Sequence, residues 1–159
     1  MATPRPSIPL LMRIPVPWVF VLAFLVGVIL QAFFPIAIGA ETKRVARIAG
    51  IVVLTAGVAL AVWALTIFRK VRTTTIPFRK SSALVTWGPY RFSRNPMYVA
   101  LTVAYLGEAG ILGQVWPLPL LLLTLVYVNG TLIPFEESHL QETFGDSYAQ
   151  YRASVRRWV

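Results

Sequence analysis

The stretch IAGIVVLTAGVALAVWALTIF, residues 48–68, contains no charged side chain and decides the class of the fold. The hydrocarbon core of a bilayer is about 30 Å thick and an α-helix rises about 1.5 Å per residue, so about 20 apolar residues cross it. This stretch is long enough to do so as one helix. Its composition therefore predicts a transmembrane segment.

Other apolar runs lie on both sides of this segment. They occupy residues 18–38, 98–112 and 116–133. The run at 98–112 is short and carries Glu108, a carboxylate that is costly at the bilayer centre and that serves either the substrate or the outer interface. We expect four transmembrane helices in all, and therefore an all-helical integral membrane protein.

Positive charge is concentrated between the second and third apolar runs. The formal net charge of the chain is +9, and the basic residues of this loop are Arg69, Lys70, Arg72, Arg79, Lys80, Arg91 and Arg94. Cytoplasmic loops of membrane proteins carry an excess of Lys and Arg, so residues 69–97 and, with four spans, both termini are expected in the cytoplasm. The first turn, which holds Lys43, Arg44 and Arg47, then faces outward. Charge placed in this way indicates membrane topology and not nucleic-acid binding.

The lack of cysteine excludes disulfides, thiolate nucleophiles and cysteine-based metal sites. The single histidine, His139, cannot build a metal cluster alone, so we expect no metal.

The segment GPYRFSRNPMY, residues 88–98, lies at the end of the basic loop. Its two prolines fix backbone angles and Gly88 permits a tight turn, which indicates a segment of defined shape. A plain basic loop that only marks topology or holds anionic headgroups does not need this pattern.

The segment PFEESHLQETFGDSYAQYRASVRRWV, residues 134–159, follows the fourth apolar run. Pro134 is typical of a helix start or kink. The apolar residues that follow recur every three or four positions, which predicts a helix, and Gly145 and Asp146 are expected to break it once. The adjacent Glu136 and Glu137 point about 100° apart on a helix, so we expect only one of them to face the bundle.

Taken together, these segments resemble the isoprenylcysteine carboxyl methyltransferase and phospholipid methyltransferase family of integral membrane enzymes, which use S-adenosylmethionine. The resemblance is carried by TTTIP (73–77), LVTWGPYRFSRNPMY (84–98) and EESHLQETFGDSYAQY (136–151). It covers roughly the C-terminal half and is closest in kind to short bacterial-type members, which implies a bacterial inner membrane.

The resemblance implies a cofactor site at the cytosolic face. The implied lining residues are Leu84, Val85, Tyr90, Asn95, Pro96, Met97 and Tyr98, with Glu136 as the acid that holds S-adenosylmethionine. A carboxylate can bind ribose hydroxyls or the cationic end of the cofactor, and aromatic faces attract a sulfonium. Arg94 is expected to position an anionic acceptor group, with Glu137 as a second candidate near the acceptor.

Two positions depart from the eukaryotic prenylcysteine enzymes. Asn95 stands where those enzymes have a histidine, and Leu132 stands where they have an arginine that meets the substrate carboxylate. Both differences argue against prenylcysteine itself as the substrate.

The sequence predicts one membrane domain, residues 1–159. Its parts are a two-span hairpin (1–68), a basic cytosolic loop (69–97), a second hairpin (98–135) and a cytosolic C-terminal helix (136–159). The predicted function is S-adenosylmethionine-dependent methylation of a lipophilic small molecule or lipid, with membrane lipids as further partners. Phospholipid amine N-methylation and a non-catalytic subunit that docks anionic lipid stay open, as do the acceptor and the oligomeric state.

Overall fold

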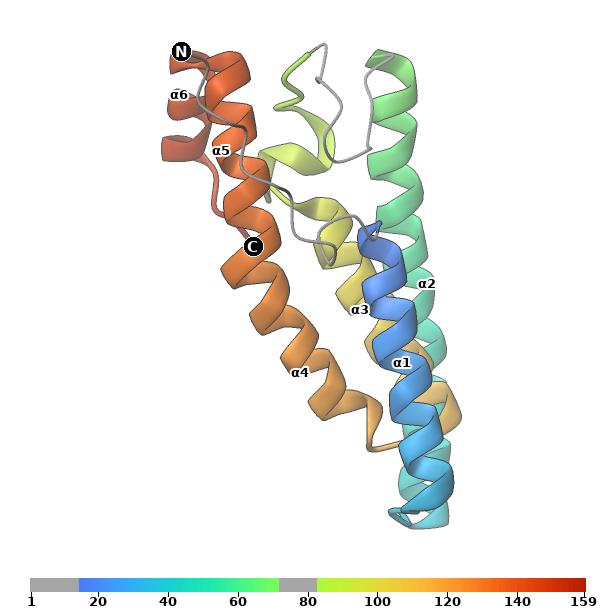
Figure 1. The fold of residues 1–159 in the computed structure, drawn as a ribbon. Coiled ribbons are helices and arrows are strands. Elements are labelled where there is room, and N and C mark those ends of the chain that lie inside the picture. The colour runs from blue at the N-terminus through green and yellow to red at the C-terminus, as the bar shows by residue number, and fades with distance from the viewer. Residues whose placement is uncertain (1–14, 72–82) are drawn as a thin grey trace, which may run out of the picture.

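The computed structural model describes residues 15–71 and 83–159, and the regular elements within them are all helical (Figure 1). They are α1 (Val16–Phe33), α2 (Ala40–Val71), the 3₁₀-helix η2 (Gly88–Arg91), α3 (Pro96–Leu112), α4 (Pro117–Tyr127), the π-helix η3 (Val128–Leu132), α5 (Ile133–Phe144) and α6 (Asp146–Ser154). The predicted all-helical class is confirmed. The TTTIP stretch at 73–77 lies outside the described residues, as do Arg72, Arg79 and Lys80.

Each predicted apolar run overlaps a helix: the first three overlap α1, α2 and α3, and the fourth overlaps α4 and η3. Within the described ranges, three helices are long and apolar enough to cross a membrane: Val16–Phe33, Ala40–Lys70 and the continuous helix Pro117–Phe144. The fourth, α3, is apolar but shorter. Figure 1 shows these helices running alternately between a loop end, where α2 ends and α3 begins, and a tip, where α1 ends and α2 begins.

Helix α2 is longer than the apolar run that predicts it. It contains 32 residues, with Glu41 in its first turn and Arg69 and Lys70 in its last. The expected turn around Lys43 and Arg47 is therefore wrong, because both belong to this helix. Lys, Arg, Glu and Ala are good helix formers, so the helix continues after its apolar composition has ended.

Small residues let α2 and α3 approach closely along much of their length (Figure 1). A Cβ atom added to Gly50 would lie 2.6 Å from the Gly107 carbonyl oxygen, and one added to Gly57 would lie 2.6 Å from the Ala104 nitrogen. Such contacts are typical of membrane helices, where lipid removes the hydrophobic drive for association and close packing takes its place.

After the turn between α3 and α4, one continuous helix runs from α4 through η3 into α5. Pro134 therefore does not start a new helix, which was one of the two expectations for it. Proline has no N–H to donate to the carbonyl four residues earlier, and the wider turn of η3 ends two residues before Pro134. The predicted break at Gly145 is confirmed: this residue has φ +53° and separates α5 from α6.

Two buried apolar clusters hold the helices together. The larger one joins α1, α3 and the α4–α5 helix, and it contains Val16, Phe20, Tyr98, Tyr105, Leu121, Val128, Leu132 and Ile133. The smaller one joins the end of α2 to the loop before α3 through Ala64, Ile67, Val85 and Tyr90. Many other large apolar side chains are exposed on α1, α2 and α4, as expected for helices surrounded by lipid.

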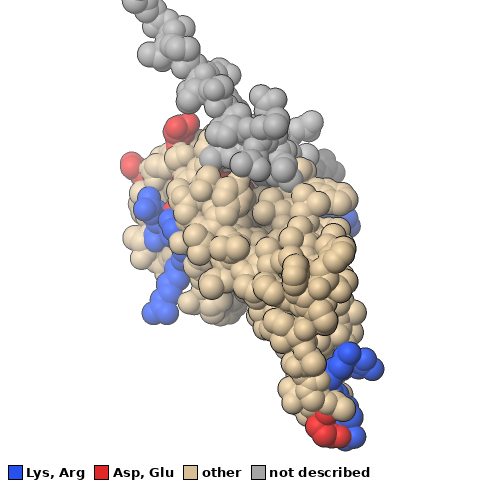
Figure 2. Space-filling model, turned by 60° about the horizontal axis from the view of Figure 1, so that its bottom comes forward, with Lys and Arg blue, Asp and Glu red and all other residues tan. Residues whose placement is uncertain are grey.

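Charged side chains gather toward the two ends of the molecule, with an uncharged surface between them (Figure 2). This distribution matches a protein whose middle lies in hydrocarbon, where charges are costly.

Candidate functional site

The candidate site begins with a tight turn between α2 and α3. Gly88 has φ +65°, and a Cβ there would collide with the side chain of Ile67. Pro89 and Tyr90, which follow Gly88 in η2, are buried. The hydroxyl of Tyr151 in α6 donates a hydrogen bond to the Tyr90 carbonyl at 2.7 Å, which ties the turn to the C-terminal helix. The defined shape predicted for this segment is confirmed.

The Tyr98 hydroxyl and the Glu136 carboxylate form the centre of the site. Tyr98 lies in the first turn of α3 and donates a hydrogen bond to Glu136 Oε1 at 2.9 Å. Burial raises the pKa of Tyr90, and the nearby Tyr151 hydroxyl and Glu136 carboxylate raise it further. The Tyr98–Glu136 hydrogen bond therefore joins α3 to α5, and the buried Tyr90 belongs to η2 in the loop before α3.

The Tyr90 hydroxyl is buried and has no hydrogen-bond partner among the described residues. An unpaired buried hydroxyl is costly, so such a group in a site is well placed to bind a ligand.

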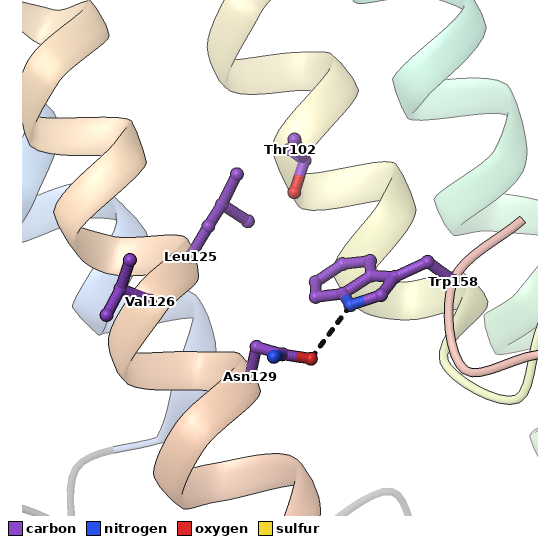
Figure 3. Close-up of a pocket in the computed structure, with 5 residues that line it drawn as sticks. All are labelled: Thr102, Leu125, Val126, Asn129 and Trp158. Atoms are coloured by element: carbon purple, nitrogen blue, oxygen red, sulfur yellow. Dashed lines mark hydrogen bonds between the residues drawn. The ribbon is translucent and has the colours of Figure 1, made fainter.

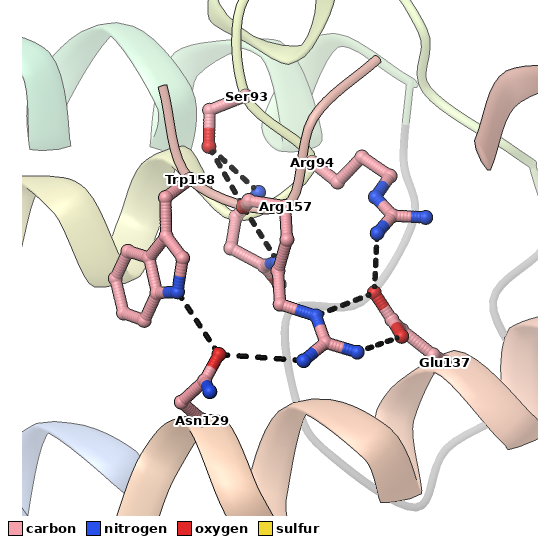
Figure 4. A network of polar contacts seen from close by, with 7 residues as sticks. Ser93, Arg94, Asn129, Glu137, Arg157 and Trp158 are labelled. Carbon is pink, nitrogen blue, oxygen red and sulfur yellow. Dashed lines mark hydrogen bonds and ion pairs between the residues drawn. The ribbon is translucent and has the colours of Figure 1, made fainter. Parts of the chain in front are cut away.

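The Glu137 carboxylate is held by two arginines (Figure 4). Arg94 Nη2 lies 3.0 Å from Glu137 Oε1, and Arg157 contacts both oxygens, with Nη2 at 2.7 Å from Oε2 and Nε at 3.2 Å from Oε1. The Glu137 side chain is 7% exposed. This hydrogen bond from Arg157 to Glu137 raises the pKa of Arg157.

As expected, only one of the two adjacent acids faces a helix of the bundle, but the other is buried as well. Glu136 faces Tyr98 on α3, whereas Glu137 faces the loop before α3 and Arg157. Both directions are occupied by protein because the chain turns back after Gly145 and covers a second side of α5.

Arg94 has unused hydrogen-bonding capacity. Its side chain is 10% exposed, and only its Nη2 reaches Glu137. Its Nε and Nη1 atoms are buried and lack a partner in the part of the chain that the structure describes. This guanidinium can therefore hold Glu137 with one edge and a further acceptor with another.

The other sequence-predicted residues separate into groups. Val85, Tyr90 and Met97 share the smaller apolar cluster, and Leu84 is partly buried beside Val85 in the sequence. Pro96 is buried at the start of α3. The Asn95 side chain instead donates to the Arg157 carbonyl at 3.0 Å, so it faces the C-terminal segment and not the Tyr98–Glu136 pair.

Arg157, Trp158 and Asn129 were not singled out from the sequence, yet they lie at the site. The Asn129 side-chain oxygen accepts hydrogen bonds from Trp158 Nε1 at 3.0 Å and from Arg157 Nη1 at 3.3 Å. Asn129 was visible in the sequence only as a polar residue within the fourth apolar run. The pair Arg157 and Trp158 carries no local signal, because its position follows from the reversal at Gly145.

A cavity of ≈ 300 Å³ lies beside these residues, between α3 and α4 (Figure 3). Its lining residues are Thr102, Leu125, Val126, Asn129 and Trp158. In Figure 3 the Trp158 ring reaches across from the C-terminal segment toward α4.

Comparison with known proteins gives two matches. The sequence pattern of the phospholipid methyltransferase family (PEMT) matches residues 45–147. Protein-S-isoprenylcysteine O-methyltransferase of Schizosaccharomyces pombe is 40% identical over 76 residues, which cover 48% of this chain and 32% of the relative. The chain thus spans a minor part of the length of that relative. No solved structure matches.

Proposed function

Because this chain belongs to the phospholipid methyltransferase family, whose pattern covers residues 45–147, we propose that it is an S-adenosylmethionine-dependent methyltransferase acting on a lipophilic small molecule or lipid. The observation that carries the proposal is the hydrogen bond from Tyr98 to Glu136 at the loop end of a membrane-spanning bundle, where Tyr90 is also buried. All three residues lie inside the family match.

The side chains at this site suit the groups of the cofactor. Glu136 would accept hydrogen bonds from ribose hydroxyls or from the ammonium group, while Tyr98 holds the carboxylate in place. Tyr90 offers a buried aromatic ring and an unpartnered hydroxyl. The free nitrogens of Arg94 would bind a carboxylate, either that of the cofactor or that of an acceptor.

S-adenosylmethionine, when bound, supplies a methyl group from its sulfonium sulfur to a nucleophile that attacks in line with the methyl–sulfur bond. The main task of the protein is then to align the acceptor and keep water away. Tyr90 and Tyr98 are buried, and their rings would help to keep water away from a bound cofactor. An acceptor carboxylate arrives already ionised and needs only a positioning cation, the role proposed for Arg94, with Glu137 fixing the direction of its guanidinium.

Methylation of a phospholipid amine is a second candidate, because the family that matches is the phospholipid methyltransferase family. An amine must lose its proton before it attacks, so this reaction needs a base as well as alignment. We place the protein in a bacterial inner membrane with the loop end in the cytoplasm, in accord with the basic residues 69–94.

The proposal is tested by calorimetric titration of the purified protein, in detergent and in lipid nanodiscs, with S-adenosylmethionine and S-adenosylhomocysteine. We expect Glu136→Gln to weaken binding by about tenfold or more, since a hydrogen bond to a charged group contributes about 1.5–3 kcal/mol. The matched control is Glu142→Gln, which makes the same change on an exposed part of α5.

Weaker binding by Glu136→Gln together with unchanged binding by Glu142→Gln would support the assignment of Glu136. Absence of binding by well-folded wild-type protein in both environments would reject the methyltransferase proposal. A non-catalytic subunit that docks anionic lipid would then be the better account.

A further inference from the structure

The C-terminal tail, residues 155–159, is fastened to the loop before α3. The Arg94 backbone N–H donates to the Arg156 carbonyl at 2.9 Å. The Arg157 carbonyl accepts hydrogen bonds from the Ser93 hydroxyl at 3.2 Å and from the Asn95 side chain at 3.0 Å. The tail lies beyond residue 147, where the family match ends.

The side chains of the tail join the two parts of the site (Figure 4). Arg157 bridges Glu137 and Asn129, and Trp158 donates to the same Asn129 oxygen. Asn129 belongs to the π-helix η3, and π-helical turns occur frequently at functional sites. The fastened backbone and these hydrogen bonds fix the Trp158 ring against the larger apolar cluster.

Trp158 forms one wall of the cavity between α3 and α4 (Figure 3). The opposite wall is Leu125 and Val126, and the cavity volume of ≈ 300 Å³ is at the lower end for ligand sites. Val126 is also 65% exposed, next to Leu122 and Leu123 at 63% and 64%. The cavity is therefore continuous with the apolar outer surface of α4, from which a hydrocarbon chain can enter.

The cavity lies close to the proposed methyl-transfer site. Thr102 is one helical turn beyond Tyr98, to whose carbonyl its hydroxyl donates at 2.8 Å. Asn129 precedes Glu136 by about two turns of the same continuous helix, or about 10 Å of rise. A molecule with its chain in the cavity would thus present its polar end to Asn129 and to Arg157, which donates a hydrogen bond to Asn129.

We propose that this cavity holds a single hydrocarbon chain of the methyl acceptor, and that Trp158 is the specificity-determining residue that limits the width of that chain. The inference rests on the proposed methyltransferase function. One chain is favoured over two because of the small volume, and an apolar wall with polar groups at one end suits an amphiphile lying along the bilayer normal.

The test is photolabelling in lipid nanodiscs with a diazirine-bearing palmitic acid, followed by mapping of the modified peptides. Unlabelled palmitic acid and phytanic acid compete; they share a carboxyl group, but phytanic acid has a wider, methyl-branched chain. We expect label on the pocket segments of α3, α4 and the tail. Trp158→Ala should shift the competition ratio at least threefold toward phytanic acid, and Trp158→Phe should shift it by less.

The matched control is Ile51→Ala, which shortens an exposed residue of α2, a helix that does not line the cavity, and should leave the ratio unchanged. Binding of S-adenosylhomocysteine reports whether each variant is folded; if Trp158→Ala fails this check, Trp158→Phe decides. An unchanged ratio in a folded variant, or label spread evenly over the exposed helices, would overturn the inference while leaving cofactor binding intact. Pocket labelling in a wild-type protein that binds no cofactor would instead overturn the role as an acceptor site together with the proposed function.

Discussion

The hydroxyl of Tyr98 can be removed on its own to test the centre of the site. Tyr98→Phe removes the hydroxyl that reaches Glu136 and little else, because its ring stays in the larger apolar cluster. We expect about tenfold weaker binding of S-adenosylhomocysteine, measured by calorimetry, since the carboxylate loses a positioning hydrogen bond.

The matched variant is Tyr105→Phe, two helical turns further along α3, which removes a hydrogen bond to the Pro117 carbonyl instead. It should leave cofactor affinity unchanged. Equal loss of affinity in both variants would indicate a general defect in α3 and contradict the role given to Tyr98.

The ion pairs of Glu137 with Arg94 and Arg157 can be tested by neutralising Glu137. Glu137→Gln leaves Arg94 and Arg157 without a counter-charge in a largely buried position, and breaking such a pair by removing one partner costs about 3 kcal/mol. We expect a lower midpoint of thermal unfolding in detergent, followed by tryptophan fluorescence. Glu142→Gln, on the exposed side of α5, should leave the midpoint in place. If both variants unfold alike, these ion pairs contribute nothing specific to stability.

The α2–α3 contact tests the fold at the scale of an element. Gly57→Val places a branched side chain where the Ala104 backbone lies within 2.6 Å of a Cβ atom, so the two helices must separate. We expect a large loss of folded protein in size-exclusion chromatography and lower thermal stability. Ala56→Val adds similar bulk to the exposed side of α2 and should be tolerated. Normal folding of the Gly57 variant would contradict the close approach.

Helices were predictable from the sequence where a local property defines them. Hydropathy located the four apolar runs, and Gly145 marked the break before α6. The bounds of the helices were less predictable. Residues 41–47 include charged side chains that suit water but are also good helix formers, so α2 begins well before its apolar part. The spacing of Gly50, Gly57 and Gly107 was present in the sequence but acquires meaning only once α2 and α3 are known to be neighbours.

The site was predictable only in part for the same reason. The resemblance singled out Tyr98 and Glu136, which the structure brings together, but a contact across 38 positions of the chain has no local signature. Arg94 and Glu137 were proposed for separate tasks near the acceptor and prove to be ion-pair partners. The roles of Arg157 and Trp158 depend on the path of the chain after Gly145, which no short pattern encodes.

The orientation of the whole molecule can be tested because the chain has no cysteine. A single cysteine at Glu41 or at Arg91 places a label on an exposed residue at the tip or at the loop end. We expect a membrane-impermeant maleimide to reach Arg91→Cys only in inverted vesicles and Glu41→Cys only in right-side-out vesicles. The reverse pattern would reject the cytoplasmic placement of the site.

The length of α2 links the molecule to the thickness of its membrane. Its 32 residues extend about 48 Å, well beyond a hydrocarbon layer of about 30 Å. A helix of this length must tilt or protrude, and its basic side chains at both ends resist being drawn into lipid. Since α3 is bound tightly along α2, a change in that tilt carries Tyr98 with it. The thickness of the bilayer would thus set how far the site lies from the lipid headgroups.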